Sequence, residues 1–255
     1  MSVTNPIKLS AVISVHNEQG QLADCLKTLS FADQIVVLLD KCTDQSGDVA
    51  RAFTDQIVKG NWAKEGERRN AGIAACAGEW IFEIDADERV SEELAQEIRK
   101  TIETTSFDWH EILVDNYVGN RLVRWGWGAS FGKAAYPGLF RKGVKVWGDQ
   151  RVHPSLSWSG RKGPKLNNRL VHYVDRNLSD MIKRLDNYST ARAKDLREQN
   201  VKDTTLNNVR RFISRFFKCY VFRKGYREGG YGLIVAICAG LFPLLSHLKA
   251  TLEDD

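Results

Sequence analysis

Two carboxylates separated by one residue follow an apolar run at residues 80–84, whose sequence W-I-F-E-I is typical of a buried strand. Asp85 and Asp87 stand at the carboxyl end of this strand, where open α/β sheets bind their ligands. Two converging carboxylates repel each other unless a cation lies between them, and Mg²⁺ or Mn²⁺ bridging to a diphosphate has the required oxygen chemistry. The pair therefore predicts a metal site, and a polar turn after a strand is the alternative.

The elements before this pair alternate between strand and helix patterns. Apolar strand patterns lie at residues 9–15, 35–39 and 57–58, and helical patterns lie at 22–29, 49–53 and 65–77. This β-α-β order predicts an α/β fold whose parallel, doubly wound sheet has right-handed crossovers. Because the carboxyl ends of parallel strands meet at one edge, polar residues after the first and second strands should lie near Asp85 and Asp87.

The second half of the chain changes character. Ser91 predicts the N-cap of a helix, and short strands are expected at residues 112–118, 122–125, 139–141, 144–147 and 170–174. Ser179 is expected to cap a helix that ends near residue 198 and turns Ile182 and Leu185 inward. We expect one domain over residues 1–175, whose two halves divide at about residue 105. A helical extension should follow over residues 176–255.

The basic charge of the chain is local. The net charge is +5 over 255 residues, yet residues 210–227 contain seven Lys and Arg and no acid, so the rest is mildly acidic. Aromatic residues interleave with these cations. An anionic membrane surface is the expected partner, and nucleic acid is the alternative.

Residues 229–248 carry no formal charge, and 20 residues can span about 30 Å as a helix. Gly240, Pro243, Ser246 and His247 interrupt this segment. We therefore favour an interfacial or re-entrant segment, with a single span or a buried helix of the protein as the alternatives. Residues 1–8 have no apolar core of signal-peptide length, and the five cysteines form no C-x-x-C pair. Reduced thiols in a protein that stays in the cytoplasm are expected.

Four ordered motifs support a resemblance to glycosyltransferase family 2. They are S-A-V-I-S-V-H-N-E from residue 10, L-D-K-C-T-D from 39, R-R-N-A-G from 68 and D-A-D-E-R-V from 85. Together with L-F-R-K, R-V-H-P and L-V-H-Y further on, they are most similar to the bacterial lipopolysaccharide-core subgroup of β-glycosyltransferases. The resemblance implies a GT-A fold, a nucleotide-sugar donor, and a divalent cation, Mg²⁺ or Mn²⁺. It makes residues 1–175 a catalytic domain, with a nucleotide-binding half to about 105 and an acceptor half over 106–175.

The resemblance also implies roles for individual residues. The nucleotide would contact residues that follow the first two strands or lie on the third helix, namely Val15, Asn17, Glu18, Asp40, Arg69 and Asn70. Asp40 would accept hydrogen bonds from uracil or ribose. One of Arg68 and Arg69 should face the nucleotide, and the other should be a solvated helix residue. Asp85 would face the nucleotide sugar and Asp87 would bind the metal, with His153 as a further ligand, whereas Glu88 should only enter the next helix.

An inverting transfer needs a general base for the acceptor hydroxyl, and Asp149 is the predicted base. His153 and His172 could each contact metal or phosphate, or be structural. Two departures from the family pattern matter. Leu39 and Lys41 stand where relatives commonly have an acid and a glycine, and Pro154 stands where many have a glutamate.

The predicted protein is a metal-dependent, inverting glycosyltransferase at the cytoplasmic face of the inner membrane. It would use a UDP-sugar and a lipid-linked or lipopolysaccharide-core glycan acceptor. A sugar-nucleotide-binding or scaffold protein of the same fold is the non-enzymatic alternative. A nucleotidyltransferase is disfavoured, because residues 16–20 (H-N-E-Q-G) are not a glycine-rich phosphate loop with a basic residue.

Overall fold

A computed structural model describes residues 6–151 and 154–253 of the chain. The described residues form two units. Unit 1 comprises residues 6–114, 135–150 and 154–172, and unit 2 comprises residues 115–134, 151 and 173–253. Unit 2 therefore takes in residues 115–134 in addition to the C-terminal helices, which the sequence did not predict.

Unit 1 begins with the predicted parallel sheet. Its elements are β1 (Leu9–Val15), α1 (Leu22–Lys27), β2 (Gln34–Asp40), α2 (Ser46–Arg51), β3 (Ile57–Gly60), α3 (Glu65–Ala75) and β4 (Trp80–Asp85). Strand β1 pairs in parallel with β2 and β4, and β2 pairs in parallel with β3. Val15 lies opposite Leu39, and Ser14 lies opposite Asp85. The carboxyl ends of β1, β2 and β4 thus meet at one edge, as predicted.

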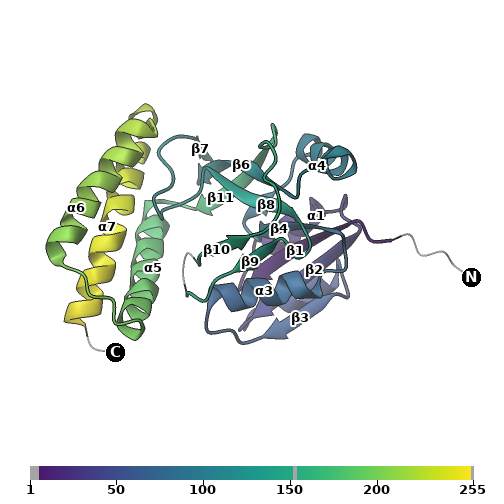
Figure 1. Cartoon of the computed structure of the whole chain (residues 1–255), viewed down its shortest axis with the longest axis horizontal. Coiled ribbons are helices and arrows are strands. Elements are labelled where there is room, and N and C mark those ends of the chain that lie inside the picture. The colour runs from purple at the N-terminus through teal and green to yellow at the C-terminus, as the bar shows by residue number, and fades with distance from the viewer. Residues whose placement is uncertain (1–5, 152–153, 254–255) are drawn as a thin grey trace, which may run out of the picture. The chain divides into compact units, whose positions relative to one another are not determined.

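The strand side chains alternate between two apolar layers. Leu9, Ala11 and Ile13 join the buried side chains of α1 and α4 on one face, whereas Val12 packs with Ile73 of α3 on the other. Figure 1 shows α3 lying across strands β1 to β3. Because helices cover both faces, the central strands are almost continuously apolar.

The sheet continues with antiparallel strands. The further elements are β5 (Glu88–Arg89), α4 (Glu92–Thr104), β6 (Trp109–Val118), β8 (Ala135–Arg141), β9 (Lys145–Trp147), β10 (Leu156–Trp158) and β11 (Arg169–Asp175). The strand order is β3-β2-β1-β4-β8-β6-β11-β5, and β9 pairs separately with β10, a strand that the sequence did not predict. Ser91 is the N-cap of α4, as predicted, and accepts a hydrogen bond from the amide of Leu94.

Unit 2 is built on helices. It contains β7 (Arg121–Val123), α5 (Leu178–Glu198), α6 (Thr205–Phe217), the π-helix η1 (Lys218–Phe222), the 3₁₀-helix η2 (Gly225–Glu228) and α7 (Gly230–Leu252). Figure 1 shows α5, α6 and α7 side by side. Residues 115–134 belong to this unit because they contribute Val118, Val123, Trp127 and Phe131 to its apolar core.

Three local predictions in unit 2 are wrong. Asn177, not Ser179, caps α5, since its side chain accepts a hydrogen bond from the amide of Asp180. Ile182 lies on the exposed side of this helix, although Leu185 is buried as expected. The strand expected over residues 122–125 ends at Val123, because the buried carboxylate of Glu228 accepts the next two main-chain N–H groups.

Helix α7 is long and apolar enough to cross a bilayer by length and composition, and 56% of its most apolar stretch is buried within the protein. It runs through Pro243 without a break.

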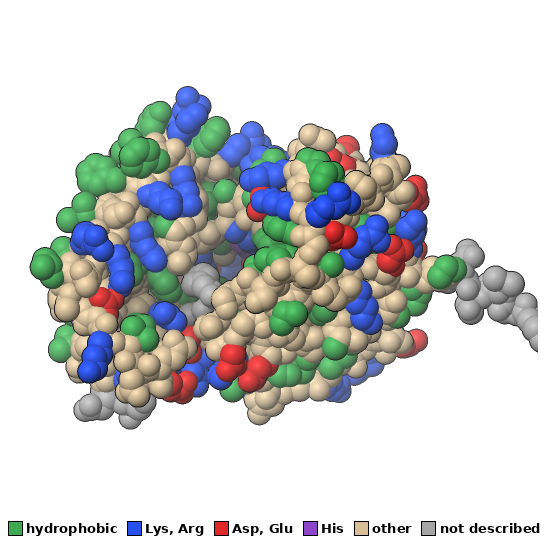
Figure 2. Space-filling view, in the orientation of Figure 1, with side chains coloured by type: hydrophobic (Ala, Val, Ile, Leu, Met, Phe, Trp, Pro, Cys, Tyr) green, Lys and Arg blue, Asp and Glu red, His purple; other side chains and the backbone are tan. Residues whose placement is uncertain are grey.

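Figure 2 shows hydrophobic and basic side chains together over the region where Figure 1 draws α6.

Candidate functional site

The loops after β1 and β2 are tied together by side-chain hydrogen bonds. Asn17 has a left-handed φ of 56°, which asparagine tolerates better than most residues. Its Oδ1 accepts a hydrogen bond from the amide of Thr43 at 2.8 Å, and Ser46 Oγ accepts one from the amide of Glu18 at 2.9 Å. Asn17 and Glu18 therefore lie beside the loop of the second strand, as their assignment to one pocket requires.

Asp40 ends β2 as a mostly buried carboxylate. Its Oδ1 accepts a hydrogen bond from the amide of Trp62 at 3.1 Å, and Arg68 Nη1 lies 3.5 Å from its Oδ2. A carboxylate has about four lone pairs, so Asp40 keeps acceptor capacity for a ligand. The next residue, Lys41, has a left-handed φ of 52°. This backbone conformation favours glycine, which explains the glycine that we expect in relatives at this position.

Glu18, after β1, feels the charges of Asp85 and Asp87 at the carboxyl end of β4. Burial raises the pKa of Glu18 to about 7, and repulsion from Asp87 and Asp85 adds to the increase. Asp87 Oδ2 lies 3.3 Å from His172 Nε2, while its Oδ1 is buried with no hydrogen-bond partner among the described residues. Asp87 and Asp85 therefore lie close enough to Glu18 to repel it, and one oxygen of Asp87 has no hydrogen-bond partner in the described part of the chain. The metal site stays a prediction.

Glu88 does not serve as a helix-entry residue, so that prediction is wrong. Its side chain is fully buried, and Oε2 accepts a hydrogen bond from the amide of Asp85 at 2.9 Å. The residue lies in β5 opposite His172 of β11. Glu88 therefore shapes the turn that carries Asp85 and Asp87, and the same pairing of β5 with β11 brings His172 to Asp87.

Arg69 is held by three carboxylates inside unit 1. Its guanidinium donates to Glu65 and to Glu83, both at 2.8 Å, and Nη2 lies 3.2 Å from Asp85 Oδ1. Burial alone would lower the pKa of Arg69, but these acids raise it well above its ordinary value. Arg69 therefore stays charged and positions Asp85.

The expectation that one of the two arginines is a solvated helix residue is wrong. Both side chains are mostly buried, Arg68 beside Asp40 and Arg69 beside Asp85.

Glu83 and Lys145 complete this network, although the sequence did not predict that they would be partners. Lys145 Nζ lies 2.6 Å from Glu83 Oε2, and both side chains are buried. Burial alone would raise the pKa of Glu83, but Lys145 and Arg69 outweigh it and hold the pKa below its ordinary value. The sequence did contain a signal for this ion pair, because a glutamate inside the apolar run 80–84 needs a buried partner.

Asn70 positions the segment that precedes Asp149. Its side-chain amide donates to the carbonyl of Trp147 at 2.9 Å and accepts from the amide of the same residue at 3.0 Å. The carbonyl oxygen of Gly148 also lies against Gly66 of α3. The loop is thus fixed to the helix that carries Arg68 and Arg69. The role of Asn70 in nucleotide binding stays a prediction.

Asp149 is exposed, and its carboxylate pairs with Lys64 Nζ at 2.6 Å. The structure thus places a carboxylate next to α3, held by an ion pair that the sequence did not predict. His153, the further metal ligand that we expected, lies outside the described residues.

Replacing Gly66 with alanine should displace the loop that carries Asp149. The new Cβ would lie 1.7 Å from the carbonyl oxygen of Gly148, so the main chain of one element must move. We expect a loss of about 1–3 kcal/mol in the free energy of unfolding. Urea unfolding followed by tryptophan fluorescence measures it. Gly20→Ala is the control, since nothing lies within 4 Å of its Cβ; equal effects of the two variants would contradict the proposed contact.

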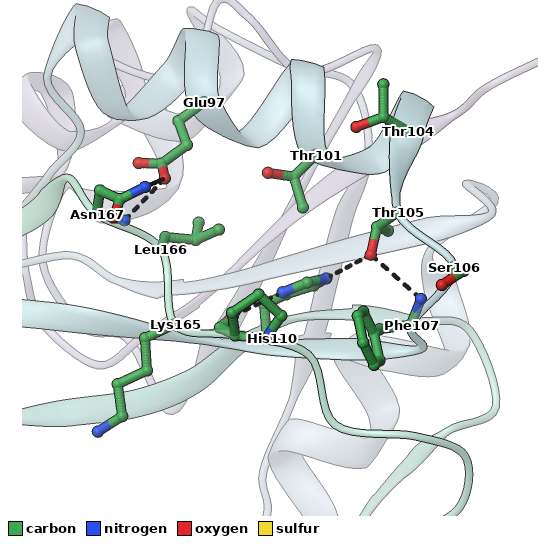
Figure 3. A pocket seen from close by; sticks show the side chains of 11 residues that line it. Glu97, Thr101, Thr104, Thr105, Ser106, Phe107, His110, Lys165, Leu166 and Asn167 are labelled. Carbon is green, nitrogen blue, oxygen red and sulfur yellow. Dashed lines mark hydrogen bonds between the residues drawn. The ribbon is translucent and has the colours of Figure 1, made fainter.

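A pocket lies in another part of unit 1. This pocket of about 400 Å³ is formed by α4, β6 and residues 164–167 (Figure 3). His110 bonds to Thr105 Oγ1 and the carbonyl of Pro164, and Glu97 accepts hydrogen bonds from Asn167. It contains none of the predicted site residues, and these polar groups are already paired with each other. We assign it no function.

The parallel sheet, with its acids at the carboxyl edge beside two paired arginines, has the arrangement of an α/β unit of the GT-A fold. The sequence model described as glycosyl transferase family 2 matches residues 10–145, more than half of the chain. The chain therefore belongs to glycosyl transferase family 2 and is a glycosyltransferase, as the motifs predicted.

Two relatives and one solved structure illustrate this membership. An uncharacterized glycosyltransferase of Rickettsia bellii is 24% identical over 243 residues, which are 89% of this chain and 80% of the relative. The lipopolysaccharide core biosynthesis glycosyltransferase LpsC of Rhizobium meliloti is 23% identical over 257 residues, 95% of this chain and 92% of LpsC. Residues 1–349 of S. aureus TarS, in complex with UDP-GlcNAc, share the fold with a TM-score of 0.54 and 12% identity, over 93% of this chain and 82% of TarS.

Proposed function

We propose that the chain transfers a sugar from a UDP-sugar to a lipid-linked or lipopolysaccharide-core glycan, with inversion at the anomeric carbon. The observation that carries the proposal is the unbonded, buried oxygen of Asp87 among repelling acids at the end of β4. The complex of TarS with UDP-GlcNAc supports the donor class, and the name of LpsC supports the acceptor class.

A divalent cation fits this site. Asp87 and His172 would hold it, and Asp85 and His153 are the further candidates. In the described part of the chain no three His, Cys, Asp or Glu side chains are grouped as ligands, so diphosphate oxygens and water would complete the coordination, as is usual for Mg²⁺. When bound, the cation neutralises the charge that develops on the leaving diphosphate.

Other residues of the chain would bind the nucleoside and position Asp85. Asp40, Asn17 and Glu18 are at the strand ends where the nucleoside would bind. Arg69 holds Asp85 from the side of α3, and Asp85 would face the sugar of the donor.

A donor screen by thermal shift tests the proposal. A UDP-sugar should raise the melting temperature in the presence of Mn²⁺, and the increase should shrink when the metal is chelated. Equal increases with and without metal would remove the cation from the proposal. A response to other nucleotide sugars but not to UDP-sugars would overturn the donor class.

Asp149→Asn should lower kcat for sugar transfer by about 10²–10⁴-fold with little change in the KM for the donor, because Asp149 is the proposed general base. Steady-state kinetics measure both constants. Lys64→Met is the matched variant, since it removes only the ion-pair partner. If Lys64→Met lowers kcat as much as Asp149→Asn, the carboxylate acts only as a loop anchor.

We also propose a peripheral or re-entrant location at the cytoplasmic face of the inner membrane. The cations of residues 210–227 support it. Residues 210–253 contain much of the core of unit 2, so point variants are a better test of membrane binding than truncation.

A further inference from the structure

Helix α7, the most apolar segment of the chain, is the core element of unit 2. Its Val235, Ala236, Ala239 and Phe242 are buried in the same cluster as Met181 and Leu185 of α5. Close approach also ties α7 to α6, because a Cβ on Gly240 would lie 2.8 Å from the carbonyl oxygen of Phe212.

Polar contacts fix the C-terminal half of α7 to its neighbours. Lys249 Nζ bonds to Asp186 Oδ1 at 2.5 Å and to Thr190 Oγ1 at 2.7 Å, both on α5. His247 Nε2 lies 3.2 Å from Thr205 Oγ1 at the start of α6. The apolar face of α7 that points to α5 and α6 is therefore occupied by protein.

The outer face of α6 differs from α7, because it exposes an apolar stripe at helical spacing. Leu206 is 78% exposed, Ile213 49% and Phe217 52%, and Val209 lies between them. The stripe continues past the helix through Val221 and Phe222, the latter 79% exposed. Asn208 and Cys219, on the opposite side, are buried. The "α6 face" is defined here as Leu206, Val209, Ile213, Phe217, Val221 and Phe222.

Cations lie on the segment that carries this face. Arg210 and Lys218 are exposed and form no ion pair with any residue in 6–151 or 154–253. No Asp or Glu occurs between Asp203, which pairs with Arg211, and the buried Glu228. Lys224 and Arg227 lie over the ring of Trp125 and add positive charge beyond the end of the stripe.

We propose that the α6 face binds an anionic lipid bilayer, with α6 lying in the plane of the interface. A large apolar stripe with Lys and Arg along its borders is the pattern of interfacial helices. Two copies meeting through this face would bring their unpaired cations together without an acid between them, which disfavours self-association. Four of the six stripe residues are aliphatic, whereas single-stranded nucleic acid needs aromatic rings for stacking.

This proposal does not rest on the identity of the donor or the acceptor. Membrane binding by the α6 face and the proposed sugar transfer can therefore fail separately. The proposal rests on the proposed membrane location and keeps the anionic membrane surface expected for residues 210–227, but it departs from the expectation that residues 229–248 form an interfacial or re-entrant segment. Here α7 supports the helix that makes the contact.

Flotation of the full-length protein with lipid vesicles tests the α6 face. The wild type should bind vesicles made of equal parts phosphatidylglycerol and phosphatidylcholine, and bind phosphatidylcholine alone much less. Arg210→Gln/Lys218→Gln should weaken binding by about 25-fold, because each basic residue near the surface contributes about fivefold. Ile213→Asp/Phe217→Asp should weaken it at least as much, since both the stripe and its charge balance change.

Two control variants match these changes at exposed positions of unit 1. Lys59→Gln/Lys100→Gln removes the same charge, and Phe53→Asp/Val146→Asp replaces two exposed apolar residues. Both should bind vesicles like the wild type. Thermal unfolding and the donor-induced thermal shift establish that each variant is folded.

Three results would overturn the proposal. The first is vesicle binding that the α6 variants leave unchanged, or that the controls weaken equally. The second is a wild-type dimer that the α6 variants dissociate while vesicle binding persists, which would assign the face to a second copy of the chain. The third is salt-sensitive retention on single-stranded RNA that depends on Arg210 and Lys218, with no binding to the anionic vesicles.

Discussion

Replacement of Asp87 by asparagine is expected to abolish the metal-dependent thermal shift by a UDP-sugar and to slow sugar transfer by at least about a hundredfold. The substitution keeps the shape of the side chain but removes the charge that a divalent cation needs. It also removes repulsion on Glu18, whose raised pKa depends in part on Asp87. The metal-free variant should therefore unfold at the same temperature as the wild type or at a higher one.

Thermal shift and transfer kinetics at several Mn²⁺ concentrations measure these effects. Asp24→Asn is the matched control, because Asp24 is an exposed helix residue that pairs only with Lys27 among the ion pairs of the described chain. The control should change neither quantity. A variant at Asp87 that keeps a metal-dependent donor shift would place the cation elsewhere, and loss of activity with a large drop in the melting temperature would indicate a structural role for Asp87.

The parallel half of unit 1 was predictable because its determinants are local. Each strand is a short apolar run, each helix has its own periodicity, and β-α-β units leave few possible connections. The polar residues Asp40, Asp85 and Asp87 could be placed at one edge for the same reason. The sequence could not show which N-cap α5 uses, since Asn177 and Ser179 are both good caps and packing decides between them.

The partners of these residues depend on contacts between distant segments. His172 meets Asp87 because the two-residue strand β5 pairs with β11, and so short a strand leaves almost no pattern in the sequence. Glu83 and Lys145 are brought together by the antiparallel half of the sheet, whose register no local motif determines. The family resemblance singled out these acids, whose roles stay predictions, but the residues that hold them in place required the structure.

Lys145→Met should lower the free energy of unfolding by about 3 kcal/mol, because it leaves a buried carboxylate without its main partner. Only 1% of the Lys145 side chain is exposed, and its ammonium also donates to the carbonyl of Pro137 at 3.1 Å. Glu83 would retain Arg69, which Asp85 and Glu65 share. We therefore expect kcat to fall as well, since Arg69 would be drawn toward Glu83 and would position Asp85 less firmly. Urea unfolding and transfer kinetics measure the two effects.

The double variant Glu83→Gln/Lys145→Met distinguishes this network from simple loss of packing. With the charge of Glu83 removed, Lys145→Met should lower the free energy of unfolding much less than it does in the wild type. The two substitutions should therefore be coupled by on the order of 1–3 kcal/mol. Lys162→Met is the surface control, because it breaks a partly exposed pair with Glu111 that Lys165 also serves, and it should cost no more than about 1 kcal/mol. If Lys145→Met costs no more than Lys162→Met, or if the double variant equals the sum of the single ones, the buried pair does not stabilise the site. In that case Arg69 would position Asp85 independently of Glu83, and Glu83→Gln alone should leave kcat unchanged.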